Sequence, residues 1–364
     1  MFAPLRPESP NFPRLDSLRF IASVGIVLNH VRRAVVPTGF VSEAVTQVDA
    51  FVLFVDLFFI ISGFIMCYVY KESVATLPQY TTFLRKRFAR LIPLHYAVLL
   101  LYLSVLAIAT VFQVKINHPE AFDLSCVPSH LFLTYAFNTC PKFAFNTPAW
   151  SISAEMGMYI LFPLLIKASV RSRTIMFVGS LVVLSLATSH LNARPWYEWT
   201  FDWGVARAFP SFVFGTILFD QQVSVTKLPF SSLLFRLFVG GFILGAAFGM
   251  NEVPLVAMIY CIVLFGLAAD LSKAQGSISP RLAPLGQLTY SIYMLHEPIL
   301  LIMVDILAVK FLHIAGVALN WTLAGVMLLI VSISYASFTW YETPARQWIA
   351  GGRRTRAAIS PASS

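Results

Sequence analysis

Ionisable residues interrupt the apolar stretches of this sequence, and the pair nearest the amino terminus could carry acid–base chemistry. His30 follows Arg19 by eleven residues within one apolar stretch. Eleven residues make almost three helical turns, so both side chains lie on one helix face, about 16 Å apart along the axis. Histidine ordinarily titrates near neutral pH and can act as a general acid or base. The alternative is an interfacial arginine beside a histidine that only packs.

A carboxylate and two hydroxyl groups open a later apolar stretch. The sequence PAWSISAE brings Glu155 close to Ser151 and Ser153. Three polar side chains at the start of a spanning helix predict a polar pocket rather than a lipid-facing surface. We therefore include Glu155 among the catalytic candidates and both serines among the further site candidates. Capping of the helix by Ser151 together with Glu155 is the alternative.

A second carboxylate, Asp56, lies among aromatic residues in the sequence VDLFFIISGF. A carboxylate in such surroundings needs a partner, and ionisable residues within spans are functional candidates. That partner could be a basic residue such as His30 or Arg207, in a purely structural pair. Asp56 or Glu155 could instead orient the imidazole of His30, because a carboxylate beside a histidine fixes its tautomer.

Two arginines of the sequence FLRKRFARL are candidates for binding phosphate. Arg87 and Arg90 lie three residues apart and hence on one face of a helix. Guanidinium groups bind phosphate oxygens in pairs, whereas a charge that only orients the chain in the membrane could equally be lysine. The alternative to phosphate binding is such an orientation signal.

A second histidine, His296, stands in the sequence YSIYMLHEP directly before Glu297 and Pro298. Proline lacks a backbone N–H and so leaves a helix carbonyl without its usual donor. His296 is therefore a candidate for substrate contact. A proline-kinked packing site is the alternative.

The elements that must position these residues are transmembrane helices. The 364 residues are 58% hydrophobic and 12% charged, whereas soluble domains carry about 25% charged residues. Long apolar stretches exceed the roughly 18 residues that a spanning helix requires. We predict an all-α, polytopic bundle of about ten spanning helices, near residues 18–35, 48–70, 92–113, 148–168, 174–190, 204–220, 232–249, 253–269, 285–305 and 316–340.

The distribution of basic residues predicts the orientation of this bundle. With the amino terminus in the cytoplasm, most of the 26 lysines and arginines fall in cytoplasmic segments. Both termini are then cytoplasmic, and the net charge of +9 needs no nucleic-acid partner. We predict one membrane domain over residues 1–350, with a short basic cytoplasmic tail at 351–364.

The longest loop of this topology, residues 114–147, lies outside the cytoplasm and contains Cys126 and Cys140. Disulfides form in oxidising compartments. The sequence leaves open whether these two cysteines pair.

Five motifs occur in a fixed order along the chain. They are Arg19 followed by His30, then VDLFFIISGF, RFARLIP, PAWSISAE and YSIYMLH. In these motifs the sequence resembles, over nearly its whole length, the membrane proteins of acyltransferase family three. This family O-acetylates sugars of lipopolysaccharide, exopolysaccharide and nodulation factors.

The resemblance implies an acyl-CoA-dependent O-acyltransferase of the bacterial inner membrane. His30 would be its catalytic histidine with Arg19 as motif partner, and Arg87 and Arg90 would be the family's Arg-x-x-Arg pair. The donor would be cytoplasmic acyl-CoA, most simply acetyl-CoA, and the acceptor a hydroxyl group of a glycan or glycolipid across the bilayer. We expect no metal and no permanently bound cofactor.

The alternative function is a proton-coupled transporter or a flippase of lipid-linked sugars. Intramembrane histidine and carboxylate side chains would then form a proton relay instead of an acyl-transfer site. Only an enzyme would release free CoA from acetyl-CoA in the presence of an acceptor.

Overall fold

The computed structural model describes residues 5, 12–35, 48–116, 119–190, 194–273 and 281–351 of the chain, and helices are the only regular secondary structure in them. The predicted tail, apart from Gly351, lies outside the described residues. The predicted all-α class is confirmed.

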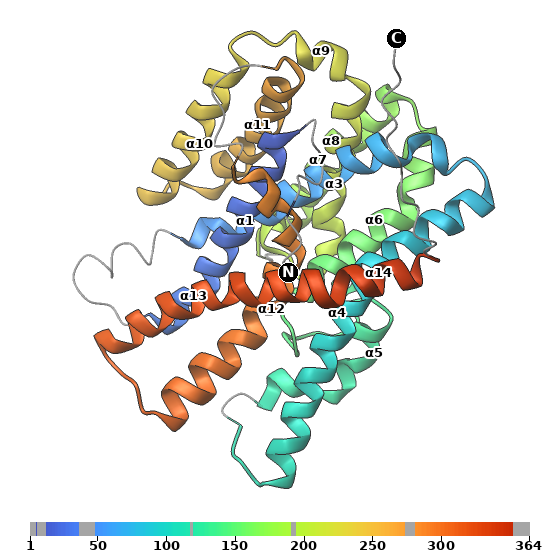
Figure 1. Ribbon diagram of the computed structural model, residues 1–364. Coiled ribbons are helices and arrows are strands. Elements are labelled where there is room, and N and C mark those ends of the chain that lie inside the picture. The colour runs from blue at the N-terminus through green and yellow to red at the C-terminus, as the bar shows by residue number, and fades with distance from the viewer. Residues whose placement is uncertain are drawn as a thin grey trace, which may run out of the picture.

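The described helices form one bundle (Figure 1). The longer helices are α1 Pro13–Val31, α3 Phe54–Tyr70, α4 Leu77–Val111, α6 Ala149–Lys167, α7 Val170–His190, α8 Gly204–Asp220, α10 Ser231–Ala247, α11 Glu252–Leu271, α12 Thr289–Leu300 and α13 Val317–Ser337. The short ones are α5 Val127–Leu131, α9 Gln222–Thr226 and α14 Thr343–Ile349. The π-helical segments Leu301–Phe311 and Phe338–Glu342 continue α12 and α13.

Seven helical segments within the described residues are long and apolar enough to cross a membrane, so the chain is a multi-pass membrane protein. They contain α3, α4, α6, α7, α11, α12 and α13. Three predicted spans correspond to α1, α8 and α10. Helices α8 and α10 have only 17 residues each, and α1 carries three charged residues within 19. The count of ten spans and the cytoplasmic placement of both termini stay predictions.

Helix α4 begins well before the predicted span at 92–113. Thr76 and Gln79 form a capping box at its amino terminus, and Pro78 occupies the first turn, where proline is tolerated. The basic segment that was expected to precede the span is therefore helical and continuous with it. As a result, Arg87 and Arg90 are held rigidly by α4.

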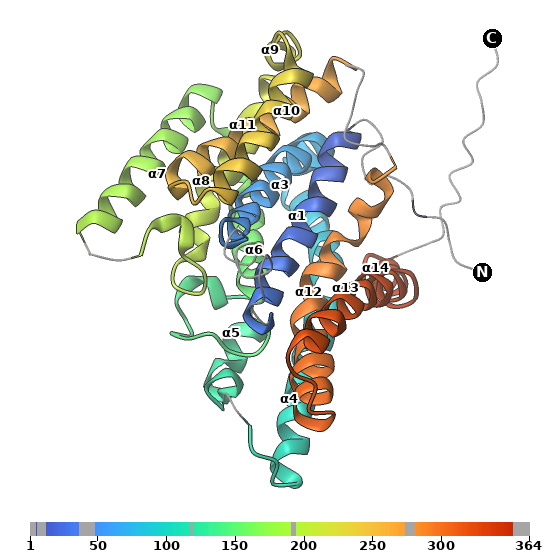
Figure 2. The same cartoon turned by 90° about the vertical axis from the view of Figure 1, so that its left-hand side faces the viewer.

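Two glycines allow α3 and α8 to pack backbone against backbone. A side chain on Gly63 would collide with the carbonyl of Phe212, and one on Gly215 would collide with the carbonyl of Ile60. Small residues at a helix interface permit such close approach within a membrane. Helix α3 is thereby fixed at the centre of the bundle, between α1 and α8 (Figures 1 and 2).

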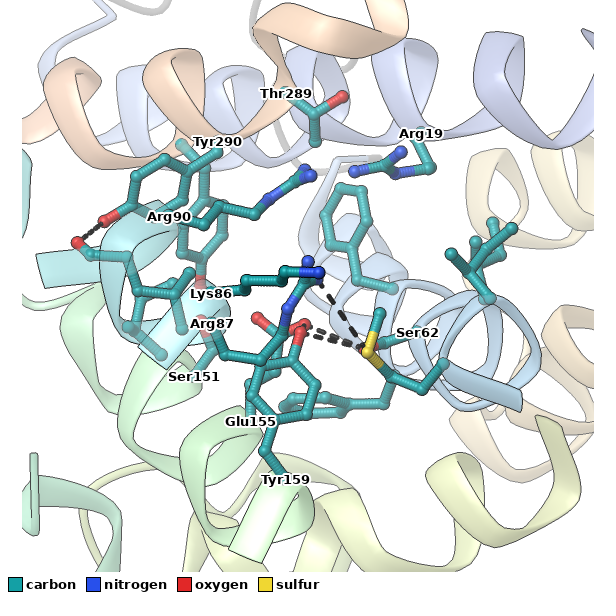
Figure 3. Close-up of a pocket in the computed structure, with 18 of the residues that line it drawn as sticks. Arg19, Ser62, Lys86, Arg87, Arg90, Ser151, Glu155, Tyr159, Thr289 and Tyr290 are labelled. Atoms are coloured by element: carbon teal, nitrogen blue, oxygen red, sulfur yellow. Dashed lines mark hydrogen bonds between the residues drawn. The ribbon is translucent and has the colours of Figure 1, made fainter. Parts of the chain in front are cut away.

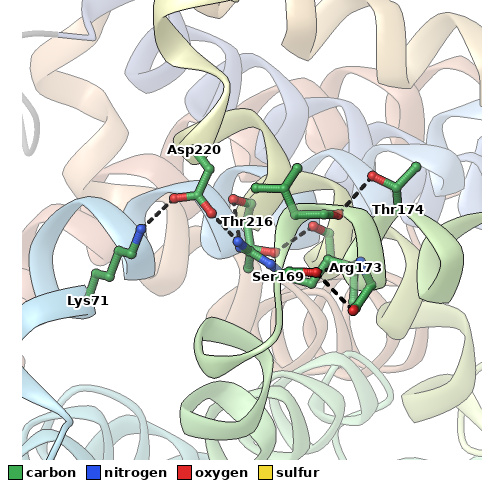
Figure 4. A network of polar contacts seen from close by, with 9 residues as sticks. Lys71, Ser169, Arg173, Thr174, Thr216 and Asp220 are labelled. Carbon is green, nitrogen blue, oxygen red and sulfur yellow. Dashed lines mark hydrogen bonds and ion pairs between the residues drawn. The ribbon is translucent and has the colours of Figure 1, made fainter.

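A charged network joins three helices at one end of the bundle. The carboxylate of Asp220, the last residue of α8, binds both Lys71, just after α3, and Arg173 in α7 (Figure 4). Arg173 also donates to the carbonyl of Thr216 at 3.1 Å. We call this end, where α3 terminates and α4 begins, the basic end.

The opposite end carries the loop between α4 and α6, and we call it the loop end. Cys126 and Cys140 form a disulfide there, which settles the pairing that the sequence left open. Ser153 accepts a hydrogen bond from the backbone N–H of Ala136 at 3.0 Å and donates to the carbonyl of Leu133 at 2.6 Å. The loop is therefore tied to α6 by hydrogen bonds and closed by a covalent link.

Candidate active site

A cavity of about 440 Å³ lies among the central helices. Side chains from α1, α3, α4, α6, α12 and α14 line it (Figure 3). The predicted site residues that face it are Arg19, Arg87, Arg90, Ser151 and Glu155. The structure thus brings together residues that are spread over three of the sequence motifs.

Helix α3 runs along the whole cavity, so residue positions on α3 measure distance along it. Its lining residues extend from Val55 to Tyr70, which corresponds to about 22 Å of helix. Arg87 contacts the Tyr70 end, Glu155 contacts Ser62, and Tyr293 packs against Phe58. The cavity is therefore an elongated channel. Its Tyr70 end lies at the basic end of the bundle, Glu155 lies in its middle, and Tyr293 and Phe58 form its aromatic end.

Five cationic side chains gather at or near the basic end of the cavity: Arg19, Lys86, Arg87, Arg90 and Arg346. Figure 3 shows the head groups of the first four directed into one space. The guanidinium group of Arg87 donates to the Tyr70 hydroxyl at 2.8 Å and lies 4.9 Å from the centre of that ring. Such a concentration of positive charge in a partly closed cavity attracts a polyanion.

Two of these cations were missed as site residues by the sequence analysis. Lys86 was interpreted only as an orientation signal, although it adjoins the arginine pair. Arg346 lies on α14, more than 250 positions from Arg87 and Arg90, and only the contact of α14 with α4 brings it to the cavity. No local pattern in the sequence indicates that contact.

Glu155 lies midway along the cavity. Its Oε1 atom accepts a hydrogen bond from Ser62 at 2.8 Å and another from Tyr159. Ser151 lines the cavity one turn earlier and donates to the carbonyl of Pro148 at 3.1 Å. The carboxylate is thus bound within the cavity wall and does not serve the start of α6 as a cap.

His30 does not line the cavity but lies beyond its aromatic end. Its Nδ1 atom pairs with Oε1 of Glu297, and its ring packs edge-on against His296 with 4.8 Å between ring centres. The expectation that Glu155 or Asp56 orients His30 differs from this geometry, because Glu297 occupies that place. Glu297 follows His296 directly in the sequence, so the motif that contains His296 also supplies the partner of His30.

His296 is completely buried, and its two ring nitrogens have different surroundings. Nδ1 lies 3.2 Å from the carbonyl of Ile292, which can only accept a hydrogen bond. The proton therefore resides on Nδ1, and Nε2 retains its lone pair. In the described structure Nε2 has no hydrogen-bond partner. A buried polar atom of this kind is costly unless a ligand or substrate satisfies it.

The side chains of His30, His296 and Glu297 are close enough together for a metal ion, although the sequence predicted none. Potential ligand atoms of His30, His296 and Glu297 lie within 4.8 Å of one another. The direct contact between His30 Nδ1 and Glu297 Oε1 fits a histidine–carboxylate pair that shares a proton. We therefore interpret the group as an acid–base cluster.

Asp56 and Arg207 form a separate, fully buried ion pair. Arg207 donates to Oδ2 of Asp56 at 2.7 and 3.2 Å and to two backbone carbonyls, while Ser211 donates to Oδ1 at 3.1 Å. The sequence offered two basic partners for Asp56, His30 and Arg207. The structure pairs Asp56 with Arg207. Ser153 likewise lies apart from the cavity, in the hydrogen bonds to the loop.

Comparison with known proteins identifies the family. A family model described as an acyltransferase domain matches residues 12–338. The chain belongs to this family. The resemblance noted in the five motifs is thereby confirmed.

Two relatives of this chain have informative names. Acyltransferase MdmB of Streptomyces mycarofaciens is 28% identical over 164 residues, which are 43% of this chain and 40% of the relative. O-acetyltransferase OatA of Staphylococcus aureus is 28% identical over 196 residues, which are 49% of this chain and 30% of the relative. The matched region thus spans less than half of each relative. No solved structure matches this chain.

Proposed function

We propose that this acyltransferase moves a short acyl group, most simply acetyl, from acyl-CoA to a hydroxyl group of a glycan or glycolipid. The observation that carries this proposal is that the two ends of one channel offer chemically different groups. Five cations surround its basic end, and a histidine–carboxylate pair lies just past its aromatic end. A donor with a polyanionic head and a reactive thioester at the far end of a long arm fits this arrangement.

The basic end would hold the phosphate groups of CoA. Arg19, Arg87 and Arg90 offer guanidinium groups that can form paired hydrogen bonds with phosphate oxygens, and Lys86 and Arg346 add charge. The arm of the donor would then extend along α3 past Glu155. That path places the thioester near Tyr293 and Phe58, next to the histidine cluster.

His30 would act as the general base in the transfer. Because Glu297 binds its Nδ1, the other ring nitrogen, Nε2, is the atom that takes the proton from the acceptor hydroxyl. The hydroxyl oxygen forms a bond to the acyl carbon, the carbon–sulfur bond breaks, and the thiolate of CoA leaves and takes up a proton. The negative charge of Glu297 stabilises the imidazolium ion that forms on His30. No oxidant or reductant is involved.

We further propose that the basic end faces the cytoplasm and the loop end faces the opposite side of a bacterial inner membrane. The concentration of lysine and arginine at the basic end supports this orientation, as does the disulfide at the loop end. The donor would then enter from the cytoplasm, while the acceptor approaches from the far side. Labelling of single cysteines in intact cells should reach the 114–147 loop and should not reach residues 71–90.

The experiment that tests the function uses the purified protein in lipid vesicles with radiolabelled acetyl-CoA and candidate glycolipid acceptors. We expect release of free CoA that depends on the acceptor, together with an acceptor mass increased by one acetyl group. Uptake or flipping of the glycolipid without CoA release would favour the transporter alternative. Hydrolysis of acetyl-CoA without any acceptor product would show that the acceptor class is wrong.

A further inference from the structure

The aromatic end of the channel closes one ring short of the histidine cluster. Tyr293 lines the cavity, and its ring centre lies 6.0 Å from that of His296, which in turn lies 4.8 Å from that of His30. The ring of Phe58 meets that of Tyr293 edge to face, with 6.2 Å between their centres. We call these two rings the wall. The two rings therefore stand where a donor acyl group would end.

We propose that Tyr293 and Phe58 set the length of acyl chain that the enzyme accepts. This inference rests on the proposed function, because it requires a donor that enters from the basic end. Anchoring of the donor phosphates at that end fixes how far the thioester reaches along α3. Any carbon added to the acyl group must then be accommodated between the thioester and the two rings.

The scale along α3 supports this arrangement. Tyr70, at the basic end, and Phe58 are twelve residues apart, which corresponds to about 18 Å of helix. Tyr293 is 6% exposed, and the partly buried Phe58 packs against the same core cluster, so displacement of either ring would disturb packed side chains. Close-packed walls of this kind reject extra methylene groups, typically by about 10- to 200-fold for each one.

The volume of the Tyr293 ring, and not its hydroxyl group, should determine the selectivity. Tyr293→Phe keeps the ring and removes the oxygen, whereas Tyr293→Ala and Tyr293→Leu remove the ring and extend the cavity towards His30. Phe58→Leu opens the same wall from the neighbouring helix. Ile65→Ala is the matched control, because Ile65 lines the same cavity two turns nearer the basic end.

The test measures kcat/KM of each variant with acetyl-, propionyl- and butyryl-CoA in the same vesicles. The wild type and Tyr293→Phe should prefer acetyl-CoA strongly. Tyr293→Ala, Tyr293→Leu and Phe58→Leu should raise the ratio of butyryl to acetyl transfer by about tenfold or more. Ile65→Ala should leave that ratio unchanged.

Different failures have different meanings. If the wild type transfers no acyl group from any CoA donor, the proposed function fails. If the wild type is active but every variant that opens the wall keeps the wild-type ratio, this inference is overturned and the proposed function stands. A general loss of activity with an unchanged ratio would likewise overturn it, because a purely structural role lowers all donors equally. Since Leu retains much of the packing, the Leu variants keep the test decisive if Tyr293→Ala does not fold.

Discussion

Two of the side-chain pairs in the described bundle, Asp56–Arg207 and His30–Glu297, differ in how completely their hydrogen bonds are satisfied. Asp56 and Arg207 are 1% and 0% exposed, and a serine hydroxyl and backbone carbonyls complete their coordination. His30 and Glu297 are 16% and 22% exposed, and they lie beside the unpartnered Nε2 atom of His296. The first pair has no capacity left for a substrate. The second is partly exposed and lies next to a ring nitrogen of His296 that has no hydrogen-bond partner in the described structure.

This difference shows that an ionisable residue in a membrane span is not by itself evidence of catalysis. Burial of an ion pair is tolerated when every donor and acceptor is matched, and such a pair then acts on folding and helix packing. A reacting group needs the opposite condition, namely a proton acceptor that the fold itself leaves unoccupied. The comparison predicts different consequences for mutations in the two pairs.

The largest expected effect is the loss of transfer in His30→Ala. A general base typically contributes about 10²- to 10⁴-fold to the rate, so kcat should fall by that factor. The thermal unfolding midpoint in detergent should stay near that of the wild type, because His30 is partly exposed. The exposed His190 provides the control, since His190→Ala should change neither quantity. Near-normal turnover in His30→Ala would contradict the assigned chemistry.

Mutation of the other pair should act on stability. Arg207→Ala leaves the carboxylate of Asp56 buried without its cation, which typically costs about 3–5 kcal/mol. We expect a much lower unfolding midpoint and a poor yield of folded protein. A double variant, Asp56→Leu with Arg207→Met, should recover much of the loss because it removes both charges. If Arg207→Ala unfolded normally and lost only turnover, the contrast between the two pairs would be wrong.

Arg87→Lys should weaken donor binding while turnover largely survives. Lysine keeps the charge but cannot form the paired hydrogen bonds of a guanidinium group, so KM for acyl-CoA should rise by about tenfold. The same change at Arg90 should behave similarly. Steady-state rates over a range of acyl-CoA concentrations provide the measurement. An unchanged KM in both variants would leave these arginines with a role in orientation alone.

Glu155→Gln should instead lower kcat at saturating donor, by about tenfold, with little change in KM. The carboxylate lies midway along the channel, away from the cations of the basic end, and it accepts hydrogen bonds from Ser62 and Tyr159. Glutamine preserves the size of the side chain and removes its charge. A rise in KM equal to that of Arg87→Lys would place Glu155 with the donor phosphates.

The last prediction concerns pH and is confined to the loop end. Burial, aided by the neighbouring His95, lowers the pKa of His130 from 6.5 to about 3. Between these two pH values His130 binds a proton in the unfolded loop but not in the folded loop. The loop should therefore lose stability as pH falls from about 6.5 towards 3. Hydrogen exchange of residues 119–147 at several pH values would measure this loss.

His130→Phe should remove this dependence. Asp123 titrates at a lower pH, because its hydrogen bond from Lys142 lowers the pKa of its carboxyl group to about 2. Its contribution should be lost only below about pH 4, which separates the two groups. Protection factors in the loop, taken relative to the intrinsic exchange rate at each pH, that stay flat between pH 6.5 and 4 would contradict the role of His130.

The sequence by itself determined the class of the protein and the residues on each helix face. Composition and apolar length gave a helical membrane bundle, and helical periodicity placed Arg19 and His30 on one face of α1. The five motifs indicated the family that the family model confirms. These properties are local, because spacing along one helix depends only on 3.6 residues per turn.

The tertiary structure alone decided which residues meet. Glu297 reaches His30, Asp56 reaches Arg207, and Arg346 joins the cations of α4 through the packing of α14. Each of these contacts joins segments more than 140 positions apart in the chain. Their pairing depends on how helices cross and on where glycines permit close approach, as at Gly63 and Gly215. Periodicity gives the direction of a side chain from its own helix, but it contains no information about the helix on the other side.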